Sequence, residues 1–471
     1  MPQSEFPTRR EFLQRSAVGV AGGATAFAAS GLCEAGAAER PSPLAAKPPH
    51  FAARAKAVIF LMMEGGPSQI DTFDPKPKLE QLDGQVFKRE NVKTSQVSGT
   101  RHFVKSPFKF KHHGESGIAV SELFSETAKH VDDLAILRSG YGDSDNHPAA
   151  VFQYTTGFPV QGNPSIGSWV IYGLGSENVS LPPYVVLRDG KPFGGTTSWG
   201  NGFLPALYQG MQFRGGDHPV LNLKPPAGVT EPQQQASLDL LLKLNRRHLA
   251  DRAEFTDFAA RIASYELADR MQREIPEAID IHRETAATQR LYGLEEDKTK
   301  TFGRRCLLAR RLIERGVRYV QIWSGGWDSH DDVLGGHRNS TAQVDRPIAG
   351  LLADLKQRGM LDDTLVVWGG EFGRTADTTE AAFKKKKPGR DHNPKATLMW
   401  FAGGGVRAGQ TIGATDEVGD AAAEDRYHLN DIHATLLYLL GLDQEKLSVY
   451  HGGRQKQLTN VGGKIIHQMI G

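Results

Sequence analysis

The sequence alternates short apolar runs with longer segments in which apolar residues recur at helical spacing. Five runs are typical of buried strands, and most lead into loops rich in Gly and Asp: residues 57–63, 134–138, 317–323, 365–368 and 397–401. Near-continuous apolar runs of this length are expected where helices cover both faces of a parallel sheet.

Helical patterns lie between these runs, at residues 302–315, 341–358 and 430–440. Gly316 and Gly359 are predicted to end the first two helices. The third is predicted to run from Asn430 as N-cap to Gly441 as the residue just past its end. Strands alternating with helices predict an α/β fold, with a mostly parallel sheet and helices on both faces.

The N-terminal segment carries an export signal. Residues 8–14 (TRREFLQ) match a twin-arginine signature, an apolar run follows at 17–29, and residues 35–37 offer a small-residue cleavage site. The apolar run is too short and too rich in Gly and Ala to span a membrane. We therefore predict a periplasmic or extracellular protein.

The chain is predicted to have three parts. A twin-arginine signal peptide at 1–37 and a Pro- and Ala-rich linker at 38–55 precede one domain at 56–471. Within that domain, residues 238–300 are highly charged and helical, and we interpret them as an insertion or cap.

Composition narrows the class of protein. Among 471 residues, 56 Lys and Arg balance 54 Asp and Glu to a net charge of +2, which gives no reason to propose a nucleic-acid partner or an anionic membrane. Of the two cysteines, Cys33 lies in the predicted signal, so the mature chain keeps Cys306 alone and has no intramolecular disulfide. The 52 glycines, about 11% against a typical 7%, predict many tight loops, where functional residues concentrate.

Polar residues cluster in the loops next to the predicted strands. They are Glu64, Ser68 and Asp71; Asp143, Asp145, Asn146 and His147; Asp328, His330, Asp331 and Asp332; Glu371 and Arg374; and Arg390, Asp391 and His392. Each group alone fits a turn or a structural ion pair. Ligands of open α/β sheets bind beyond the carboxyl ends of the strands, so parallel strands would bring these groups together.

Carboxylate oxygens and imidazole nitrogens suit a divalent ion, here zinc, manganese or calcium, with one or two ions bound. The predicted ligands are Glu64, Asp71, Asp328, His330, Glu371 and His392. Arg374 is a candidate clamp for an oxyanion, because a guanidinium presents a fork of donors. Such a site could transfer phosphate or sulfate esters.

Four motifs resemble a known family. Residues 58–74 (VIFLMMEGGPSQIDTFD), 325–330 (GGWDSH), 370–375 (GEFGRT) and 389–394 (GRDHNP) are similar to an exported bacterial family catalogued as domain of unknown function 1501. That family is placed in the alkaline phosphatase and sulfatase superfamily. The resemblance extends from about residue 55 to the end of the chain and implies that superfamily's α/β core.

The chain departs from the superfamily where the nucleophile is expected. Residues 156–159 and 431–442 resemble two sulfatase core elements, and counting back from the first places His147 in the nucleophile position. Ser68 as a substitute nucleophile, and His147 as nucleophile or metal ligand, both remain open. Phe372 stands where the superfamily has a second ligand, which favours one metal ion over two.

Two hypotheses of different class follow. The first is a metal-dependent hydrolase of phosphate or sulfate esters, acting on a small molecule or a polysaccharide outside the cytoplasm. The second is a non-catalytic protein on the same fold that binds a glycan or an anion, or serves in an assembly, because His147 replaces the usual nucleophile.

Overall fold

The computed structural model describes residues 42–89, 99–216, 219–221, 223, 225–250, 256–459 and 462–471. The predicted signal peptide at 1–37 and the first residues of the predicted linker lie outside the described residues. Residues Ser42 to Gly471 form one structural unit. None of its described helices is both long enough and apolar enough to cross a membrane.

A mixed sheet forms the centre of this unit. Nine strands belong to it among the described residues, in the order β15 (Gln410–Ile412), β6 (Leu134–Tyr141), β14 (Thr397–Ala402), β10 (Thr364–Gly369), β1 (Ala57–Met63), β9 (Tyr319–Ser324), β7 (Tyr184–Leu187) and β8 (Met211–Phe213), with β18 (Tyr427–His428) beside β6. All five apolar runs of the sequence are strands of this sheet. Every residue of β1, β9, β10 and β14 is buried, as expected for strands covered on both faces.

One strand runs against the others. β1 pairs in parallel with β9 and β10, whereas β14 pairs antiparallel with both β10 and β6. The expectation of parallel direction is therefore wrong for residues 397–401. Because β10 ends and β14 begins at the same edge of the sheet, the connecting residues 370–396 stay at that edge. The reversal thus keeps two of the sequence motifs beside the carboxyl ends of β1 and β9.

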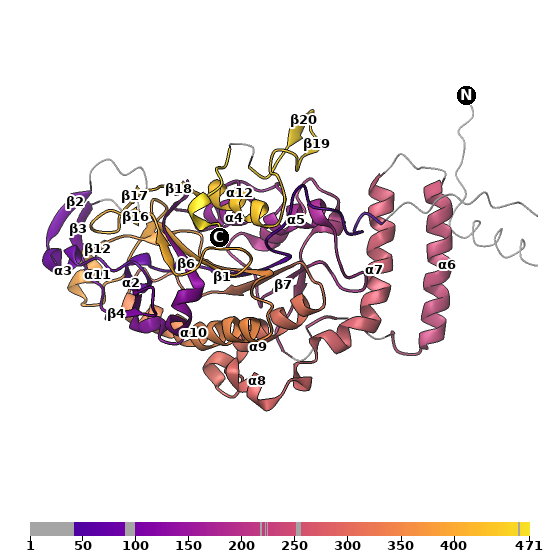
Figure 1. Cartoon of the computed structure of the whole chain (residues 1–471), viewed down its shortest axis with the longest axis horizontal. Coiled ribbons are helices and arrows are strands. Elements are labelled where there is room, and N and C mark those ends of the chain that lie inside the picture. The colour runs from indigo at the N-terminus through magenta and orange to yellow at the C-terminus, as the bar shows by residue number, and fades with distance from the viewer. Residues whose placement is uncertain are drawn as a thin grey trace, which may run out of the picture. The chain divides into compact units, whose positions relative to one another are not determined.

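Helices cover both faces of the sheet, as predicted. Figure 1 shows α4 (His147–Thr156), α5 (Ile166–Leu174) and α12 (Leu429–Leu439) on one side, and α9 (Asp297–Glu314) and α10 (Val333–Gln357) on the other. The N-cap of α12 is His428 rather than the predicted Asn430. Its ring accepts the Asn430 N–H, and the Asp431 carboxylate accepts the His428 N–H. Gly441 follows α12 with a φ of +76°, as predicted for a left-handed residue past a helix end.

Shorter elements surround this core. The small helices are α2 (Gln69–Thr72), α3 (Lys78–Leu82), α8 (Ala286–Leu291) and α11 (Glu380–Lys384). The small sheets pair β2 (Val86–Arg89) and β12 (Asp377–Thr379) with β3 (Gly99–Phe103), β4 (Phe110–His113) with β5 (Ile118–Ser121), β11 (Gly373–Arg374) with β13 (His392–Asn393), β16 (Ala414–Thr415) with β17 (Ala422–Glu424), and β19 (Val449–His451) with β20 (Arg454–Lys456).

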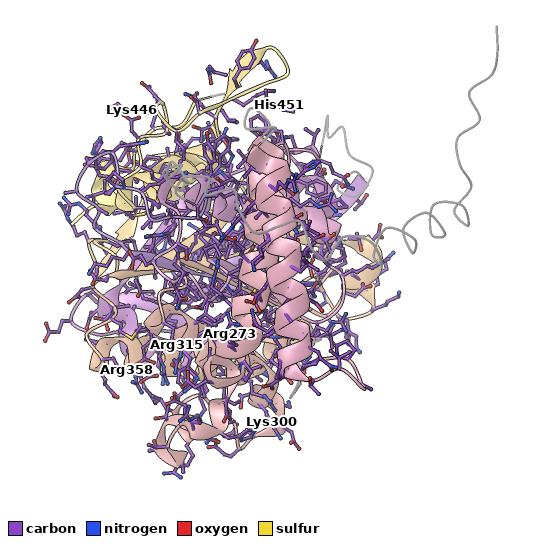
Figure 2. The ribbon with its side chains drawn as sticks, turned by 90° about the vertical axis from the view of Figure 1, so that its right-hand side faces the viewer. Arg273, Lys300, Arg315, Arg358, Lys446 and His451 are labelled. Atoms are coloured by element: carbon purple, nitrogen blue, oxygen red, sulfur yellow. The ribbon has the colours of Figure 1, made fainter. Side chains whose placement is uncertain are left out.

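The charged segment predicted at 238–300 is helical. It contains most of α6 (Glu231–Ala250) and all of α7 (Thr256–Ile279), which run side by side (Figures 1 and 2). Leu267, Met271 and Ile275 of α7 are buried, and α7 contacts α9 of the core. Exposed basic residues such as Arg273 and Lys300 lie on the side of the molecule that carries α6 and α7 (Figure 2).

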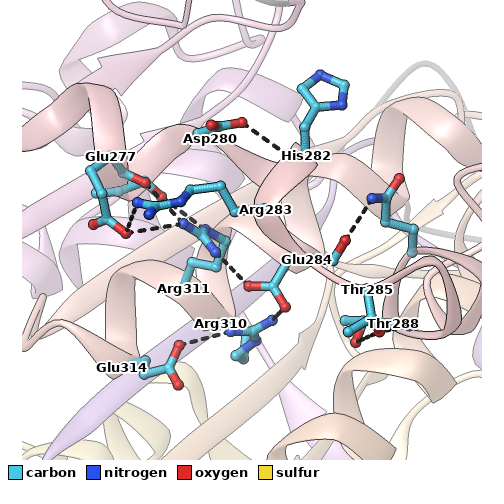
Figure 3. A network of polar contacts seen from close by, with 12 residues as sticks. Glu277, Asp280, His282, Arg283, Glu284, Thr285, Thr288, Arg310, Arg311 and Glu314 are labelled. Atoms are coloured by element: carbon cyan, nitrogen blue, oxygen red, sulfur yellow. Dashed lines mark hydrogen bonds and ion pairs between the residues drawn. The ribbon is translucent and has the colours of Figure 1, made fainter.

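An ion-pair network joins the charged helical segment at 238–300 to the core (Figure 3). The Arg310 guanidinium on α9 contacts Glu284 at 2.8 Å, Glu314 at 2.7 Å and Asp354 of α10 at 2.8 Å. Arg311 binds the other oxygen of Glu284 at 2.5 Å. Burial raises the pKa of the Glu284 carboxyl, but hydrogen bonds from the two arginines outweigh burial and lower it. The network therefore keeps this acid ionised at neutral pH.

Acid sensitivity is expected from a buried histidine on α12. His433 donates its Nε2–H to the Tyr154 carbonyl at 2.9 Å, and complete burial lowers its pKa to about 4. Unfolding raises the pKa to an ordinary value of about 6.5, so this group's contribution to stability is complete above that pH and is lost as the pH falls toward 4. Between pH 7.5 and 5 we expect the free energy of unfolding to drop by about 2 kcal/mol from this group alone.

Urea unfolding at the two pH values tests this expectation. The His433→Gln variant retains an N–H donor for Tyr154 but does not titrate, so its loss of stability over the same range should be smaller by about 2 kcal/mol. Equal losses in the wild type and the variant would contradict the assignment.

Candidate metal centre

Three histidines and one aspartate converge at the carboxyl edge of the sheet. Asp328 and His330 follow β9, His147 begins α4, and His392 lies in β13 before β14. Asp328 Oδ1 lies 3.1 Å from His330 Nε2 and 3.2 Å from His392 Nε2, and Asp328 Oδ2 lies 3.3 Å from His147 Nε2. The Nε2 atoms of His330 and His392 are 2.9 Å apart. Asp328 is thus in contact with histidines from three loops, and the ligand atoms of His147, Asp328 and His392 all lie within 4.8 Å of one another.

Oxygen acceptors hold all three rings in one orientation. The Nδ1 atom lies 2.7 Å from Glu371 Oε1 in His147, 2.7 Å from Asp391 Oδ1 in His330, and 2.6 Å from the Asp145 carbonyl in His392. Carboxylate and carbonyl oxygens only accept hydrogen bonds, so each Nδ1 carries a hydrogen. In the neutral rings the Nε2 lone pairs therefore point toward Asp328, an arrangement that needs a proton or a cation between them.

Close backbone approach builds the floor of this centre. Gly65 has a φ of +113°, and a Cβ atom there would lie 2.5 Å from the Asp328 amide nitrogen. Its N–H donates to both oxygens of Glu371, at 2.9 and 3.1 Å. At Gly389, a Cβ atom would lie 1.9 Å from the His330 carbonyl oxygen. The two glycines allow the loops to come close enough for the side chains to meet.

The residues of the centre shift one another's pKa values. Burial raises the pKa of the Asp328 carboxyl, but hydrogen bonds from the three histidines and the charge of Arg374 hold it far below its usual range. Hydrogen bonds to Asp328 and Asp391 raise the pKa of His330 to about 9, although burial opposes them. Burial dominates at His392 and lowers its pKa. Burial lowers the pKa of His147, but hydrogen bonds to Asp328 and Glu371 outweigh burial and raise it. Asp328 is therefore ionised, and His330 is protonated when no cation is bound.

The donor set fits a divalent ion. His147, Asp328 and His392 each offer a ligand atom within 4.8 Å of the others. Ligand bonds of about 2.0–2.2 Å place donors at most about 4 Å apart, so a small contraction would complete the set. Two imidazoles and a carboxylate suit zinc, iron or manganese better than calcium, which prefers oxygen. Histidines that donate Nδ1–H to oxygen acceptors are the usual arrangement around metals in proteins.

A family model described as "Protein of unknown function (DUF1501)" matches residues 55–470. The chain belongs to this family. A search of curated proteins finds no significant match.

Solved structures with some likeness to this DUF1501 protein include three named proteins. A sulfatase from Pseudoalteromonas sp. is 14% identical, with a TM-score of 0.35 over 83% of this chain and 69% of its own. Alkaline phosphatase from the Antarctic bacterium TAB5 is 12% identical, with a TM-score of 0.36 over 83% and 99%. The lipoteichoic acid synthase LtaP from Listeria monocytogenes is 12% identical, with a TM-score of 0.37 over 88% and 78%. At such values we draw no conclusion about activity from them.

Three of the six predicted ligands lie in the centre of this DUF1501 protein: Asp328, His330 and His392. Glu371 lies behind His147 and orients its ring. Glu64 pairs with Arg188 at 2.7 Å and accepts the Phe193 N–H at 2.6 Å. Asp71, fully buried, pairs with Arg390 at 2.7 Å. The last two carboxylates are thus already neutralised by arginines.

The residues predicted to act in catalysis are placed differently from one another. His147 joins the metal donor set. Ser68 is fully buried, and its hydroxyl donates to Asp71 at 2.5 Å, so a substrate cannot reach it in this structure. Arg374 is also buried; it donates to Asp328 Oδ1 at 2.7 Å and to the carbonyls of Gly65, Gly66 and Arg390. Its guanidinium therefore links three loops by hydrogen bonds and fixes the position of the Asp328 carboxylate.

Several residues of the centre were not predicted as site residues. Asp391 orients His330, and Arg101 donates to both Asp391 and Asp377, the latter at 2.6 Å. Phe193, which is 47% exposed, stacks on the His147 ring with centroids 4.2 Å apart. Asp391 could have been predicted as a site residue, because it lies between the candidates Arg390 and His392. Phe193 could not, because neither β7 nor the loop that follows it was predicted.

Glu371→Gln should weaken metal binding. A glutamine at this position retains an oxygen acceptor but loses the negative charge that favours the required form of the His147 ring. Loss of such a partner typically lowers metal affinity by 10–100-fold, and we expect a decrease of that size in a zinc titration. The control is Glu380→Gln, at an acid of α11 outside the centre whose side chain is 44% exposed. Unchanged affinity in Glu371→Gln would contradict its role as a positioning residue.

Proposed function

We propose that this protein is a metal-dependent hydrolase of phosphate or sulfate esters that acts outside the cytoplasm and binds one divalent ion. The observation that carries the proposal is the shared orientation of the three histidines. Each donates its Nδ1–H to an oxygen and directs Nε2 toward Asp328. His147, Asp328 and His392 would hold the ion. A divalent ion there supplies a Lewis acid for an ester oxygen.

The chain's own residues prepare the site for an anionic ester. Asp328 and His330 are the open side of the centre, with side chains 34% and 35% exposed. The His330 ring lies at this opening, with Nε2 3.1 Å from Asp328 Oδ1. Once Asp328 binds the ion, His330 Nε2 would be released to donate to an ester oxygen or to protonate a leaving group. Asp391 holds the ring in place for that role. Phe193 covers the other face of His147 and limits the access of water from that side.

The test is a screen of purified protein against aryl phosphates and aryl sulfates. Turnover should require added zinc or manganese, disappear with a chelator and return when metal is restored. His330→Gln should lower kcat by about 10²-fold or more if the ring acts as a general acid, while metal content stays unchanged. Turnover that is unaffected by chelation would contradict the proposal.

A second function is favoured by one specific observation. The superfamily's nucleophile position holds His147, and the other candidate, Ser68, is buried against Asp71. A glycan- or anion-binding protein, or a member of an assembly, needs neither group as a nucleophile. It would show saturable binding of a sulfated or phosphorylated ligand with no product formed.

We also propose export by the twin-arginine route to the periplasm or beyond. The support is the TRREFLQ sequence at 8–14. Cell fractionation of the wild type and of a variant with Arg9→Lys and Arg10→Lys tests it. The variant should remain in the cytoplasm at full length; equal export of both would contradict this route.

A further inference from the structure

A cavity of about 580 Å³ lies next to the candidate metal centre, and the proposed hydrolysis leaves it without a role. Four lysines line it, Lys105, Lys384, Lys386 and Lys387, against two aspartates, Asp83 and Asp332. The Lys384 to Lys387 run in the sequence thus contributes three lysines to one cavity. Apolar side chains, among them Val333 and Phe383, line the rest of the wall.

Two chain segments connect the cavity to the metal centre. Residues 329–333 and 387–390 pair in antiparallel fashion: Val333 N–H donates to the Pro388 carbonyl at 3.0 Å, and Arg390 N–H donates to the Ser329 carbonyl at 2.9 Å. His330 lies on the first segment, two residues before Asp332, and His392 follows the second. Two residues of chain span at most roughly 7 Å. The backbone of Asp332, in the wall of the cavity, therefore lies within about that distance of the backbone of His330, a separation comparable with one sugar unit.

The lysines keep most of their capacity to bind an anion. Lys105 lies 3.6 Å from Asp83 and Lys387 lies 3.9 Å from Asp332, at the long end of the range for ion pairs. Their side chains are 54% and 69% exposed. Lys384 contacts Glu380 at 2.5 Å but is 73% exposed. Such exposed pairs are weak and are readily exchanged for a ligand with higher negative charge.

We propose that this lysine cavity binds a negatively charged group on a neighbouring unit of an acidic polysaccharide whose ester is positioned at the metal centre. The proposal rests on the proposed function for its substrate and adds the requirement that the substrate is a polymer with more than one acidic group. Lysine ammonium groups recognise sulfate and carboxylate alike, as point charges. The apolar wall suits the carbon face of a sugar ring.

Calorimetric binding of a dextran sulfate oligomer at about 0.15 M salt tests this, because that ionic strength screens distant surface charges. Unsulfated dextran is the neutral probe, and polygalacturonate separates carboxylate from sulfate recognition. The variant combines Lys384→Gln, Lys386→Gln and Lys387→Gln. The matched control combines Lys243→Gln, Lys298→Gln and Lys446→Gln at three exposed lysines of other surfaces.

We expect the cavity variant to bind at least one of the two acidic polymers about tenfold more weakly than the wild type does, and the control variant to bind it as tightly as the wild type. Equal losses in both variants, equal binding of neutral dextran, or binding of neither acidic polymer by the wild type would overturn the proposal. Thermal unfolding of each variant establishes that it is folded.

Asp328→Asn separates this proposal from the proposed function. Since Asp328 lies outside the cavity, the tenfold difference between the cavity variant and the control variant should persist when both also carry Asp328→Asn, even though that change removes metal and lowers binding at the centre. Missing metal or turnover in the wild type would count against the hydrolase, whereas missing polymer binding would count against the cavity.

Discussion

Asp328→Asn is expected to lower the affinity for a divalent ion by at least about 100-fold, more than the change of any other single residue in the centre. All three histidine Nε2 atoms face this one carboxylate, at 3.1 to 3.3 Å. An amide in its place supplies no negative charge, and it leaves the buried Arg374 guanidinium without its ionic partner. Replacing a residue that only hydrogen-bonds to a metal ligand typically lowers metal affinity by 10–100-fold. Loss of the central ligand itself should therefore lower affinity by at least the upper end of that range.

A zinc titration followed by calorimetry gives the measurement. Asp331→Asn is the matched control, because Asp331 is an exposed acid three residues further along the same loop. The control should retain wild-type affinity. If both variants bind zinc as the wild type does, Asp328 is not a ligand and the convergence of the histidines is structural.

Arg310→Ala is expected to lower the free energy of unfolding by about 3 kcal/mol, the largest loss of stability expected from removing one ion-pair partner of the network around α9. This is the lower end of the range for breaking a buried pair, because Arg311 and Arg358 remain beside its carboxylates. Only 1% of the Arg310 side chain is exposed. It contacts Glu284 and Glu314, as Figure 3 shows, and also Asp354 of α10. Its removal leaves Asp354 paired with Arg358 alone and Glu284 paired with Arg311 and, at 3.7 Å, with Arg358. Each of these mostly buried carboxylates therefore loses one compensating charge but retains another. Asp354, 6% exposed, and Glu284, 11% exposed, bear most of this penalty.

Arg283→Ala in the same network provides the contrast. Arg283 is 58% exposed and pairs with Glu277 at 2.9 Å, where solvent screens the interaction. Urea unfolding should show a change of at most about 1 kcal/mol for this variant. Equal losses of stability for the two arginines would mean that the buried ion pairs of Arg310 stabilise the contact between residues 238–300 and the core no more than the exposed ion pair of Arg283 does.

Five strands of the central sheet and the C-terminal ends of three helices could be predicted from sequence, because strands buried on both faces form apolar runs and glycines follow the helix ends. The helix starts predicted at 302 and 341 were wrong, since α9 begins at Asp297 and α10 at Val333. The run at residues 57–63 coincides with β1, and Gly316, Gly359 and Gly441 follow helix ends as predicted. The direction of β14 could not be predicted, since an apolar run is the same in either orientation. The sequence also failed to predict β7 and β8, which are only four and three residues long.

The site was predicted as a set of residues but not as a geometry. Residue type placed Asp71 and Asp328 in one list of ligands, yet the first is neutralised by Arg390 and the second is surrounded by histidines. Nothing in the local sequence distinguishes the two, because each comes after an apolar run and a pair of glycines. What separates them is a contact with a residue more than 300 positions away in one case and about 60 in the other, which only the fold supplies.

The most direct measurement of the central claim is the metal content of the protein itself. The protein would be purified without a chelating column, dialysed and analysed by elemental spectrometry, beside a His147→Ala, His392→Ala double variant. The account predicts close to one equivalent of zinc, iron or manganese in the wild type and a small fraction of that in the variant. A wild type that contains no such metal, and that gains no thermal stability when one is added, would contradict it.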